Sequence, residues 1–446
     1  MIRFIDLFAG LSGIRIGFEN AANALGENTE CKLTSEIKPA AIEALQHRYP
    51  QEGPCYNIYD VKAEMIPDGI DVLLGGFPCQ AFSSAGKGLG FMDTRGTLFF
   101  EIERLIGEFT EQGHKPKGFL LENVEGLMRH GGIEPGEKYG RTLSTIVRKL
   151  ELAGYNVQVL LLDSSDYGVP QARKRVYIIG VDNNIGQVDL HNLPKKRTTF
   201  AQIREYGLPV DKTPFTEALV KACPIKLLPG KCLKDKRGGA RNIHSWDVAT
   251  KGDVSATEKA FLNQLLKERR KKKWAPIIGI DWMDGMPLTY DQITTFYNRP
   301  GLQKMLDELV EKGYLVYEHP KKKIIMRSGN NVSSRREYDT TLPKGYNIVT
   351  GKLSFPYTQF LDDNSIAPTM VAMDMDRVGV VEKKGVRHLS ISEGLRLFGY
   401  DNYDLSYLDK KKNGRRIAFD LLGNSVCVPV IEILSHRLIQ AIQHHD

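Results

Sequence analysis

The sequence predicts an α/β protein with a doubly wound, mostly parallel sheet and a second, more irregular domain. Short apolar runs alternate with helical patterns from the first residues to about residue 181. This alternation is typical of strands joined by crossover helices. From about residue 195 onward the rhythm is lost, and basic runs and loops take its place. A chain of 446 residues is also too long for one ordinary core, so two domains are expected.

The first elements have the form of a nucleotide-binding βαβ unit. An apolar run at 2–8 leads into the glycine turn 9–13, and a helical pattern follows. Glycines let the backbone approach a ligand closely, and the helix beyond them offers free N–H groups. A second strand is expected at 32–36 and ends in Glu36. An acid at this position is where such folds bind ribose hydroxyls.

The next elements follow from periodicity. A helix begins at Pro39, because proline is favoured at the first helical position. A strand expected at 56–61 places Asp60 to accept a hydrogen bond from an adenine amino group. Further apolar runs predict strands, and patterns of helical period predict helices. These strands are expected at 70–74, 118–121, 157–162 and 176–181, and the helices at 39–48, 97–109 and 143–152.

A cysteine loop follows the strand expected at 70–74. Cys79 comes after two glycines and Pro78, which restricts the backbone before it. Because ligands of open α/β sheets bind beyond the carboxyl ends of the strands, Cys79 is a candidate nucleophile. The alternative is a buried small side chain, which is what most lone cysteines are. The polar residues and glycines after Cys79 are typical of a closing lid.

Charged side chains reach the same sheet edge from two later segments. The strand at 118–121 delivers Glu122, either as a structural ion-pair partner or as an acid kept partly protonated by burial. Arg173 and Arg175 alternate where the chain enters the strand at 176–181. Alternate residues of a strand point the same way, so both arginines are expected to face one ligand.

Residues 190–365 contain all three tryptophans and several basic runs. A charge run is more often a solvated face than a binding site, but several on one half of a chain favour a polyanionic partner. Within 255–325 the pattern is that of a winged helix-turn-helix, whose third helix would lie in the major groove of DNA. The alternative is a helical insertion that only packs. The three helices are expected at 257–266, 289–296 and 301–312, followed by a strand at 314–317 and basic residues at 321–323.

Composition limits the class of protein. The six cysteines show no CxxC pair and no histidine at zinc spacing, so a reducing compartment is expected, with neither disulfides nor a metal site. No apolar run approaches the length of a membrane span, and the chain begins with a strand pattern. A cytoplasmic protein that does not enter a membrane is expected. The net charge of +7 agrees with an acidic partner such as nucleic acid.

Two patterns close the chain. A helix is expected over 387–398, with Ser390 as its cap and Glu393 at capping-box spacing. A second helix is expected to follow residues 419–426 and to run to about residue 441.

Together, six segments in this order resemble the DNA (cytosine-5) methyltransferase family of bacterial restriction-modification systems. Each motif alone is weak, but the set brackets nearly the whole chain. The resemblance implies the S-adenosylmethionine-dependent methyltransferase fold and a variable DNA-recognition domain before the last motifs. The segments are Asp6 to Gly10, Gly76 to Gln80, Glu122 to Val124, Gln171 to Arg175, Arg387 to Phe398 and Gly423 to Val426.

Carried over residue by residue, the resemblance implies that Cys79 attacks C6 of a cytosine and that Glu122 contacts its N3. Arg173 would help to hold the cytosine, and Arg175 would position Glu122 and the cysteine loop. One departure is Ser12, which stands where the family usually has glycine. The S-adenosylmethionine site would be lined by Phe8, Ala9, Gly10, Leu11, Gly13, Glu36, Ile37, Asp60, Val61, Pro78, Asn424 and Val426.

The resemblance also sets the expected organisation and partners. A catalytic domain is expected at 1–190 plus 415–446 and a target recognition domain at 191–414, with the 387–398 helix at their junction. The partner is double-stranded DNA, the enzyme acts as a monomer, and a restriction endonuclease for the same site would be its counterpart. The alternatives are methylation of cytosine in transfer RNA, a catalytically silent DNA-binding regulator, and a dinucleotide-dependent oxidoreductase that would explain only the first turn.

Overall fold

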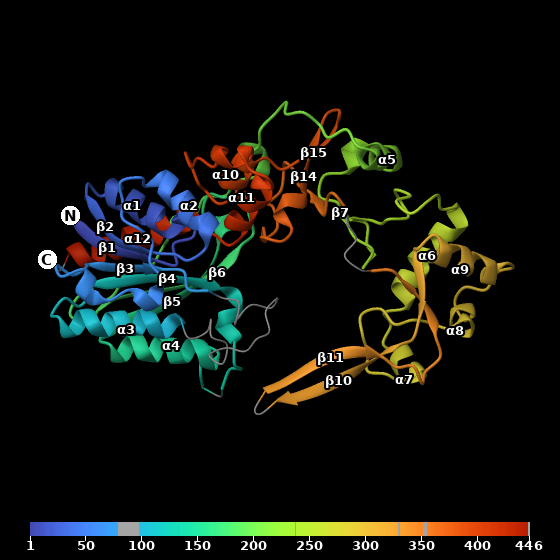
Figure 1. The fold of residues 1–446 in the computed structure, drawn as a ribbon, viewed down its shortest axis with the longest axis horizontal. Coiled ribbons are helices and arrows are strands. Elements are labelled where there is room, and N and C mark those ends of the chain that lie inside the picture. The colour runs from blue at the N-terminus through green and yellow to red at the C-terminus, as the bar shows by residue number, and fades with distance from the viewer. Residues whose placement is uncertain (79–97, 135, 237, 329–330, 351–354, 445–446) are drawn as a thin grey trace. The chain divides into compact units, whose positions relative to one another are not determined.

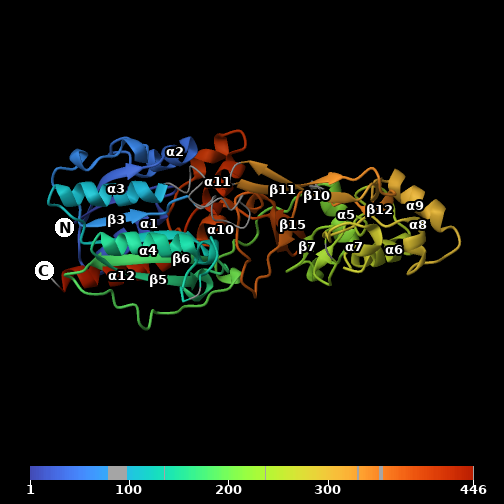
Figure 2. The same ribbon diagram turned by 90° about the horizontal axis from the view of Figure 1, so that it is seen from below.

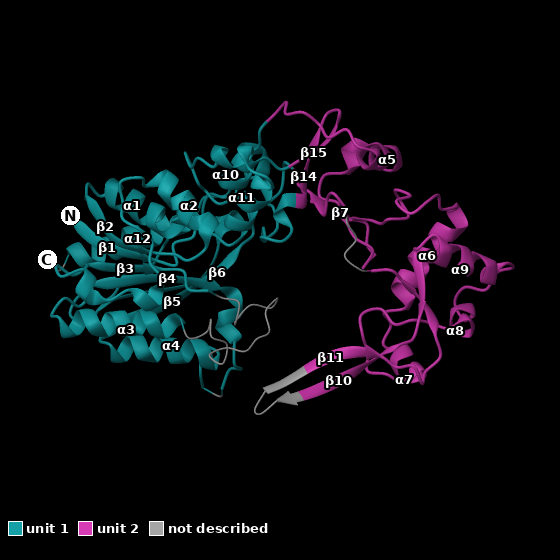
Figure 3. Ribbon diagram, viewed as in Figure 1, with its two compact units in different colours: residues 1–205, 363–376, 389–446 teal, residues 206–362, 377–388 magenta. Residues whose placement is uncertain are grey.

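The structure is a computed structural model that describes residues 1–444 apart from 79–97, 135, 237, 329–330 and 351–354; the side chains of 327–333 also lie outside the description. The chain forms two compact units (Figure 3). Unit 1 comprises residues 1–205, 363–376 and 389–446, and unit 2 comprises residues 206–362 and 377–388.

Among the described residues, unit 1 is organised around a six-stranded sheet with the order β2-β1-β3-β4-β6-β5. The first four strands in this order are parallel, and β6 runs antiparallel to both β4 and β5. This confirms the predicted α/β class with a mostly parallel sheet. The strands are β1 (Ile2–Leu7), β2 (Thr29–Ser35), β3 (Val72–Gly75), β4 (Gly118–Val124), β5 (Tyr155–Asp163) and β6 (Lys174–Asp182).

Helices cover both faces of this sheet. Figures 1 and 2 show α3 and α4 on one face and α1 with α12 on the other. Side chains alternate along β1 accordingly: Ile5 and Leu7 pack into the core beneath α3 and α4, whereas Phe4 contacts Phe18 of α1. The helices are α1 (Gly13–Ala24), α2 (Pro39–Arg48), α3 (Leu98–Glu111), α4 (Arg141–Leu152), α10 (Ile391–Arg396), α11 (Gly414–Gly423) and α12 (Val428–Gln443).

One expected strand is absent from the described chain. The segment 56–61 forms a single bridge from Tyr56 to Ser35 and then a 3-10 turn at Ile58–Asp60. The Asn57 side chain accepts a hydrogen bond from the Tyr59 N–H, and such local bonds compete with strand pairing. The other 3-10 turns are Ala63–Met65, Glu125–Arg129, Ser164–Asp166, Phe200–Gln202, Ile225–Leu227, Met375–Arg377 and Ser406–Lys410.

The helix expected over 387–398 is shorter than predicted. Residues up to His388 belong to strand β15 (Gly385–His388), and α10 begins only at Ile391. The capping box is present as predicted. The Glu393 N–H donates to Ser390 Oγ at 3.0 Å, and the Ser390 N–H donates to Glu393 Oε2 at 2.9 Å.

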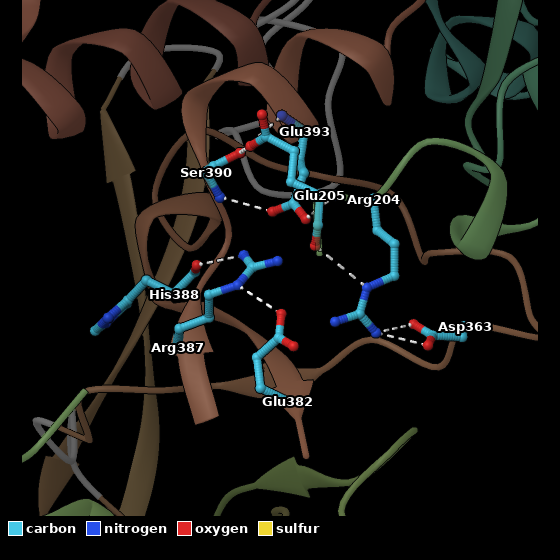
Figure 4. Close-up of polar contacts among 8 residues, drawn as sticks. All are labelled: Arg204, Glu205, Asp363, Glu382, Arg387, His388, Ser390 and Glu393. Carbon is cyan, nitrogen blue, oxygen red and sulfur yellow. Dashed lines mark hydrogen bonds and ion pairs between the residues drawn. The ribbon is translucent and has the colours of Figure 1, made fainter. Parts of the chain in front are cut away.

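The compact units divide the chain at different places from the expected domain boundaries, because tertiary contacts hold the flanking segments on unit 1. The Lys196 N–H donates to the Asp166 carbonyl, and the Val428 N–H donates to the Phe398 carbonyl. The chain leaves unit 1 after residue 205 and returns to it at residue 363. At these two points Arg204 binds both carboxylate oxygens of Asp363, at 2.7 and 2.6 Å (Figure 4). Within unit 2, Arg387 Nε lies 3.0 Å from Glu382 Oε1 (Figure 4).

The helical part of unit 2 follows the order of a winged helix. After α6, Leu288 exchanges two backbone hydrogen bonds with Tyr346 of β12, at 3.0 and 2.7 Å. Helices α8 and α9 come next, then β9, which pairs antiparallel with β12. The β10–β11 hairpin is inserted between β9 and β12 as the wing. The helices are α6 (Ala256–Glu268), α7 (Trp274–Ile278), α8 (Tyr290–Thr294) and α9 (Leu302–Glu311), and the strands β9 (Leu315–Glu318), β10 (Lys321–Ser328), β11 (Asn331–Tyr338) and β12 (Gly345–Ile348).

The rest of unit 2 is a small sheet with the order β15-β14-β13-β7-β8 and one helix. Its core contains Leu219, Phe355 and Tyr357. The elements are α5 (Pro214–Ala222), β7 (Cys232–Leu233), β8 (Asn242–Ile243), β13 (Gln359–Phe360) and β14 (Val378–Glu382), besides β15.

One stretch of the described chain, 414–443, is long and apolar enough to cross a membrane. It consists of α11 and α12, separated at residues 424–427. Buried residues make up 67% of its most apolar window, because α12 packs against the sheet of unit 1. The stretch is therefore a core element of this unit.

Candidate active site

The turn after β1 has an unusual backbone. Phe8, Gly10 and Ser12 all have left-handed φ angles of 58°, 56° and 56°. Such angles cost nothing at glycine but are strained at other residues. Ser12, the residue that departs from the family pattern, is therefore accommodated in a conformation that glycine adopts freely. No atom lies within 4 Å of the position that a Cβ would take on Gly10, so the turn has open space above it.

Glu36 holds this turn in place. Its Oε2 accepts a hydrogen bond from the Gly10 N–H at 2.8 Å, and its Oε1 accepts from the N–H groups of Ile37 and Lys38, both at 2.7 Å. A carboxylate has about four acceptor positions, so capacity remains for a hydroxyl donor. Ile37 beside it is 68% exposed, which leaves an apolar surface next to an anchored carboxylate.

The other predicted cofactor residues divide into exposed and buried groups. Asp60 and Asn424 are exposed, and the Asn424 amide donates to the Asp420 carbonyl at 2.7 Å. The buried residues shape the base of the turn: a Cβ on Gly13 would lie 2.7 Å from Val426. The partly or fully exposed residues are Phe8, Ala9, Gly10, Glu36, Ile37, Asp60, Pro78 and Asn424, and the buried ones are Leu11, Gly13, Val61 and Val426.

This arrangement fits an adenosyl ligand. The open glycine turn offers backbone N–H groups at a helix N-terminus, and the anchored carboxylate can accept from ribose hydroxyls. The exposed Ile37 offers an apolar contact to a base. Asp60 stays in reach of solvent on its 3-10 turn, which Arg104 fixes by donating to the Val61 carbonyl at 2.9 Å.

Asp6 lies in β1 just before this turn and is fully buried. Neither of its carboxylate oxygens has a hydrogen-bond partner among the described residues. Burial raises the pKa of Asp6 to about 7, although the nearby Arg15 opposes the increase. Asp6 is therefore a carboxyl group that the fold keeps protonated below neutrality.

We expect Asp6→Asn to remove a pH dependence of stability. The pKa of Asp6 is about 7 in the folded protein and 3.8 ordinarily, so the folded state binds the extra proton between these values. The free energy of unfolding therefore falls as pH rises through this window, by up to about 4 kcal/mol. The amide of the variant cannot ionise, so the variant should lack this decline. Urea unfolding at about pH 5 and about pH 8 measures the difference; equal declines in both proteins would contradict the assignment.

Glu122 and Arg175 form an ion pair near the carboxyl end of β4. Arg175 Nε lies 3.0 Å from Glu122 Oε1, and both side chains are largely shielded from solvent. Burial raises the pKa of Glu122 above its ordinary value, whereas Arg175 and Arg173 act to lower it. The balance favours a glutamate that holds a proton at higher pH than an exposed one would. The geometry therefore agrees with both interpretations of Glu122, as an ion-pair partner and as an acid kept partly protonated by burial.

The carboxyl end of β4 also contacts the segment that leads to the candidate nucleophile. Glu122 Oε2 lies 3.7 Å from the position that a Cβ would take on Gly76. The side-chain amide of buried Asn123 donates to the Phe77 carbonyl at 3.1 Å. Pro78 is the last described residue before the gap, and Cys79 itself lies outside the described residues. Gly76, two residues before the last described residue, therefore lies beside the Glu122 carboxyl group.

The two arginines have different partners, although both act on the pKa of Glu122. Arg173 is buried, and its guanidinium donates to the carbonyls of Met370, Gly423 and Ser425 at 2.9, 3.1 and 2.7 Å. Its pKa falls to about 10 because of burial and the nearby Arg175, so it remains charged at neutral pH. The side chain is committed to backbone acceptors, which argues against a role in holding the cytosine. Arg173 is a positioning residue for the 423–425 segment.

We expect Arg173→Lys to lower the free energy of unfolding by about 2 kcal/mol. One ammonium group cannot reach the three carbonyls that the planar guanidinium serves. Arg175→Lys is the matched control, because Arg175 pairs with one carboxylate side chain, Glu122, and not with a set of backbone carbonyls. Thermal unfolding measures both variants. An unchanged midpoint for Arg173→Lys, with a raised KM for DNA, would show that Arg173 binds the base after all.

Three side chains that complete this region were not identified from the sequence. Asn123 fixes Phe77, as described above. Gln171 is fully buried and links two distant segments, donating to the Leu397 carbonyl at 2.9 Å and accepting from the Met370 N–H at 3.0 Å. Tyr400 hydrogen-bonds Ser425 and lies against Gly13. The only sequence signal for Asn123 and Gln171 was their position inside the motifs that contain Glu122 and Arg173.

Comparison with known proteins agrees with this geometry. Residues 2–440 match the family described as C-5 cytosine-specific DNA methylase. The chain is 52% identical to Type II methyltransferase M.NlaIV of Neisseria lactamica, over 99% of both chains. It is 50% identical to M.NgoBV of Neisseria gonorrhoeae, again over 99% of both, and 38% identical to M.BanI of Aneurinibacillus aneurinilyticus, over 98% of this chain and 96% of that one.

Solved structures share the fold at low sequence identity. The methyltransferase EhMeth of Entamoeba histolytica superposes with a TM-score of 0.52 at 14% identity, covering 99% of this chain and 98% of that one. The Dnmt2 methyltransferase of S. pombe gives 0.51 at 14% identity, covering 99% of both chains. The match to the family over nearly the whole length, together with relatives of such high identity, shows that this chain belongs to the C-5 cytosine-specific DNA methylases, which are DNA (cytosine-5-)-methyltransferases that use S-adenosylmethionine.

Proposed function

We propose that this enzyme methylates C5 of a flipped-out cytosine in duplex DNA through a covalent Cys79 adduct, as the modification half of a type II restriction-modification system. The observation that carries the mechanism is the buried Glu122, whose raised pKa favours the protonated form beside the entry to the Cys79 segment. The relatives M.NlaIV, M.NgoBV and M.BanI are all named Type II methyltransferases, which supports the biological role.

The proposed chemistry requires a nucleophile and an acid. The Cys79 thiolate adds to C6 of the cytosine, and the proton of Glu122 moves to N3, so that the electron pair of the ring is available at C5. S-adenosylmethionine, when bound, supplies the methyl group that C5 takes. The proton on C5 then leaves to a base, the C6–S bond breaks, and N3 returns its proton to Glu122. Cys79 ends as the thiolate, ready for another cycle.

Arg175 tunes this acid. Its guanidinium holds the Glu122 carboxyl group at 3.0 Å in a fixed orientation, while its charge keeps the pKa of Glu122 from rising as far as burial alone would take it. General acids work best when their pKa lies near the working pH. An ordinary thiol has a pKa of about 8.5, so positive charge near Cys79 would also help it to ionise.

The remaining site and domain assignments follow from the same geometry. We propose that the residues exposed at the glycine turn, with Glu36 and Asp60, bind S-adenosylmethionine. Unit 2 is proposed as the target recognition domain. A stacked base must leave the duplex before it can react, at a cost of a few kcal/mol, and DNA contacts made by unit 2 would offset that cost.

The alternatives have less support. Methylation of transfer RNA is less supported because the relatives of high identity are named Type II methyltransferases. A silent regulator would have no use for the Glu122–Arg175 pair. We propose that the enzyme acts as a monomer in the cytoplasm, with a restriction endonuclease as its functional counterpart.

Bisulfite sequencing tests the proposal. Genomic DNA from a methylation-free bacterial host that expresses the protein should show protected cytosines within one short shared sequence. The Cys79→Ala variant should show none. If the wild-type protein is expressed in folded form and protects no cytosine, duplex DNA is not the substrate, and transfer RNA is the next acceptor to test.

A further inference from the structure

Helix α9 occupies the position of a recognition helix, but it carries a net negative charge, which does not favour binding to DNA. Its exposed and half-exposed side carries Asp307, Glu308 and Glu311 against a single cation, Lys304. An open groove of about 910 Å³ runs along the helix, and Asp291 of α8 adds a further carboxylate to its lining. Phosphate groups and these carboxylates repel one another. This electrostatic repulsion argues against the expectation that the third helix lies in the major groove.

The wing has the opposite charge. Within β10 and β11, the side chains that the structure describes include Lys321, Lys322, Lys323, Arg335 and Arg336, against one carboxylate, Glu337. Figure 1 shows the two strands extending away from the helices of the same unit. The hairpin therefore presents cations on a ribbon that is open to solvent.

The pairing register separates the two faces of this ribbon. Lys323 pairs with Arg336, and Lys321 pairs with Tyr338, so these four side chains share one face. The carboxylate lies on the other face, where Lys322 pairs with Glu337 and Arg335 forms an ion pair with it. The face that carries Lys323 has no carboxylate among its described side chains. An exposed apolar residue accompanies the cations of this face: Ile325, which pairs with Ser334, is 57% exposed.

A second basic segment joins the base of the hairpin. Arg270 and the three lysines that follow it form the turn between α6 and α7. Trp282 links this turn to the hairpin, because its indole N–H donates to the Arg270 carbonyl at 3.0 Å and its own carbonyl accepts from Arg336 at 3.0 Å. Arg270 pairs with Asp284, and Lys271 and Lys273 both pair with Glu268. The hairpin and the 270–273 turn are therefore parts of one surface on which cations outnumber carboxylates.

We propose that the β10–β11 hairpin and the 270–273 turn, and not helix α9, form the surface with which unit 2 contacts duplex DNA. The major groove admits a two-stranded ribbon as well as a helix, and the apolar side chain of Ile325 can contact a thymine methyl group there. Lysines along the ribbon and the turn neutralise phosphates. This inference rests on the proposed function, since it assumes that duplex DNA is the substrate.

Two matched charge reversals test the surface. Lys323→Glu on the hairpin and Lys304→Glu on α9 make the same change at exposed positions of the same unit. Affinity of the full-length protein for a mixed-sequence DNA duplex is measured by fluorescence anisotropy over a range of salt concentrations. Lys323→Glu should weaken binding about tenfold at about 0.1 M salt and reduce the slope of log K against log salt by about 1. Lys304→Glu should change neither quantity, and Lys323→Arg should restore wild-type binding.

The outcomes separate this inference from the proposed function. Loss of binding in Lys304→Glu but not in Lys323→Glu would overturn the surface assignment and restore α9 as the DNA-binding element. Equal behaviour of the two variants and the wild type would also overturn it. Thermal unfolding and S-adenosylmethionine binding, which should not change, show that each variant is folded. A wild-type protein that binds duplexes but transfers no methyl group would contradict the proposed function while leaving the surface assignment standing.

Discussion

Cys79→Ala should abolish methyl transfer and leave DNA binding intact. Without the thiol no bond forms to C6, so C5 gains no nucleophilic character, and we expect the rate to fall by about 10⁴-fold or more. The DNA contacts proposed for unit 2 do not involve this side chain, so affinity for duplex DNA should stay within about twofold of the wild type. Transfer of a radiolabelled methyl group to DNA measures the rate, and anisotropy measures the affinity.

A matched variant and a covalent trap sharpen this test. Cys223→Ala makes the same change outside the candidate active site, because Cys223 is the C-terminal cap of α5 in unit 2. This variant should keep full activity. A duplex with fluorine at C5 has no C5 proton to lose after methyl transfer, so the C6–S bond cannot break. Wild type and Cys223→Ala should form a stable protein–DNA adduct on it, and Cys79→Ala should form none. Adduct formation or substantial methylation by Cys79→Ala would overturn the nucleophile assignment.

Glu122→Gln should reduce methyl transfer by about 10²- to 10⁴-fold, the range that general acid catalysis contributes. Glutamine preserves the shape and can donate a hydrogen bond to N3, but it cannot transfer a proton. The affinity for S-adenosylmethionine should not change, because the glycine turn and Glu36 are intact. Single-turnover rates measure the effect on chemistry. A rate within about threefold of the wild type would contradict the role of Glu122 as the acid.

The pH profile gives a separate readout of the same group. The pKa of Glu122 is raised by burial, and activity that needs the protonated acid is present below that pKa and lost as pH rises through it. Arg175 lowers the pKa of Glu122, so Arg175→Gln should move the alkaline limb to higher pH, whereas Arg175→Lys should move it less. Unshifted limbs in both variants would show that Glu122 does not titrate in the rate.

Much of the fold could be predicted because it is encoded locally. Apolar periodicity located the strands and helices of unit 1, and the helix Pro39–Arg48 has the bounds that were expected. The Ser390 capping box forms as predicted, because its partners lie three residues apart. The segment 56–61 does not form the predicted strand, and the reason is also local: the Asn57 side chain stabilises a turn there.

The candidate active site shows the same division between local and distant contacts. That Glu122 reaches the sheet edge follows from its position after an apolar run. Its protonation depends on the balance between burial and Arg175, which no spacing in the sequence reveals. The contacts of Arg173 could not be predicted, because its backbone acceptors lie 197 to 252 residues further along the chain. Motif spacing indicated both arginines but not the direction in which each points.

The sequence by itself determined the fold class, because strand periodicity, glycine turns and capping boxes act over a few residues. The order of its motifs carried the resemblance to the family. Only the tertiary structure decided which side chains meet and what charge each surface presents. It gave Arg173 and Arg175 different partners, joined Asn123 to Phe77, and showed that unit 2 contains both an acidic α9 and a basic hairpin. These features depend on residues that are distant in the chain and are brought together by packing, and their energies depend on burial, which a linear pattern does not contain.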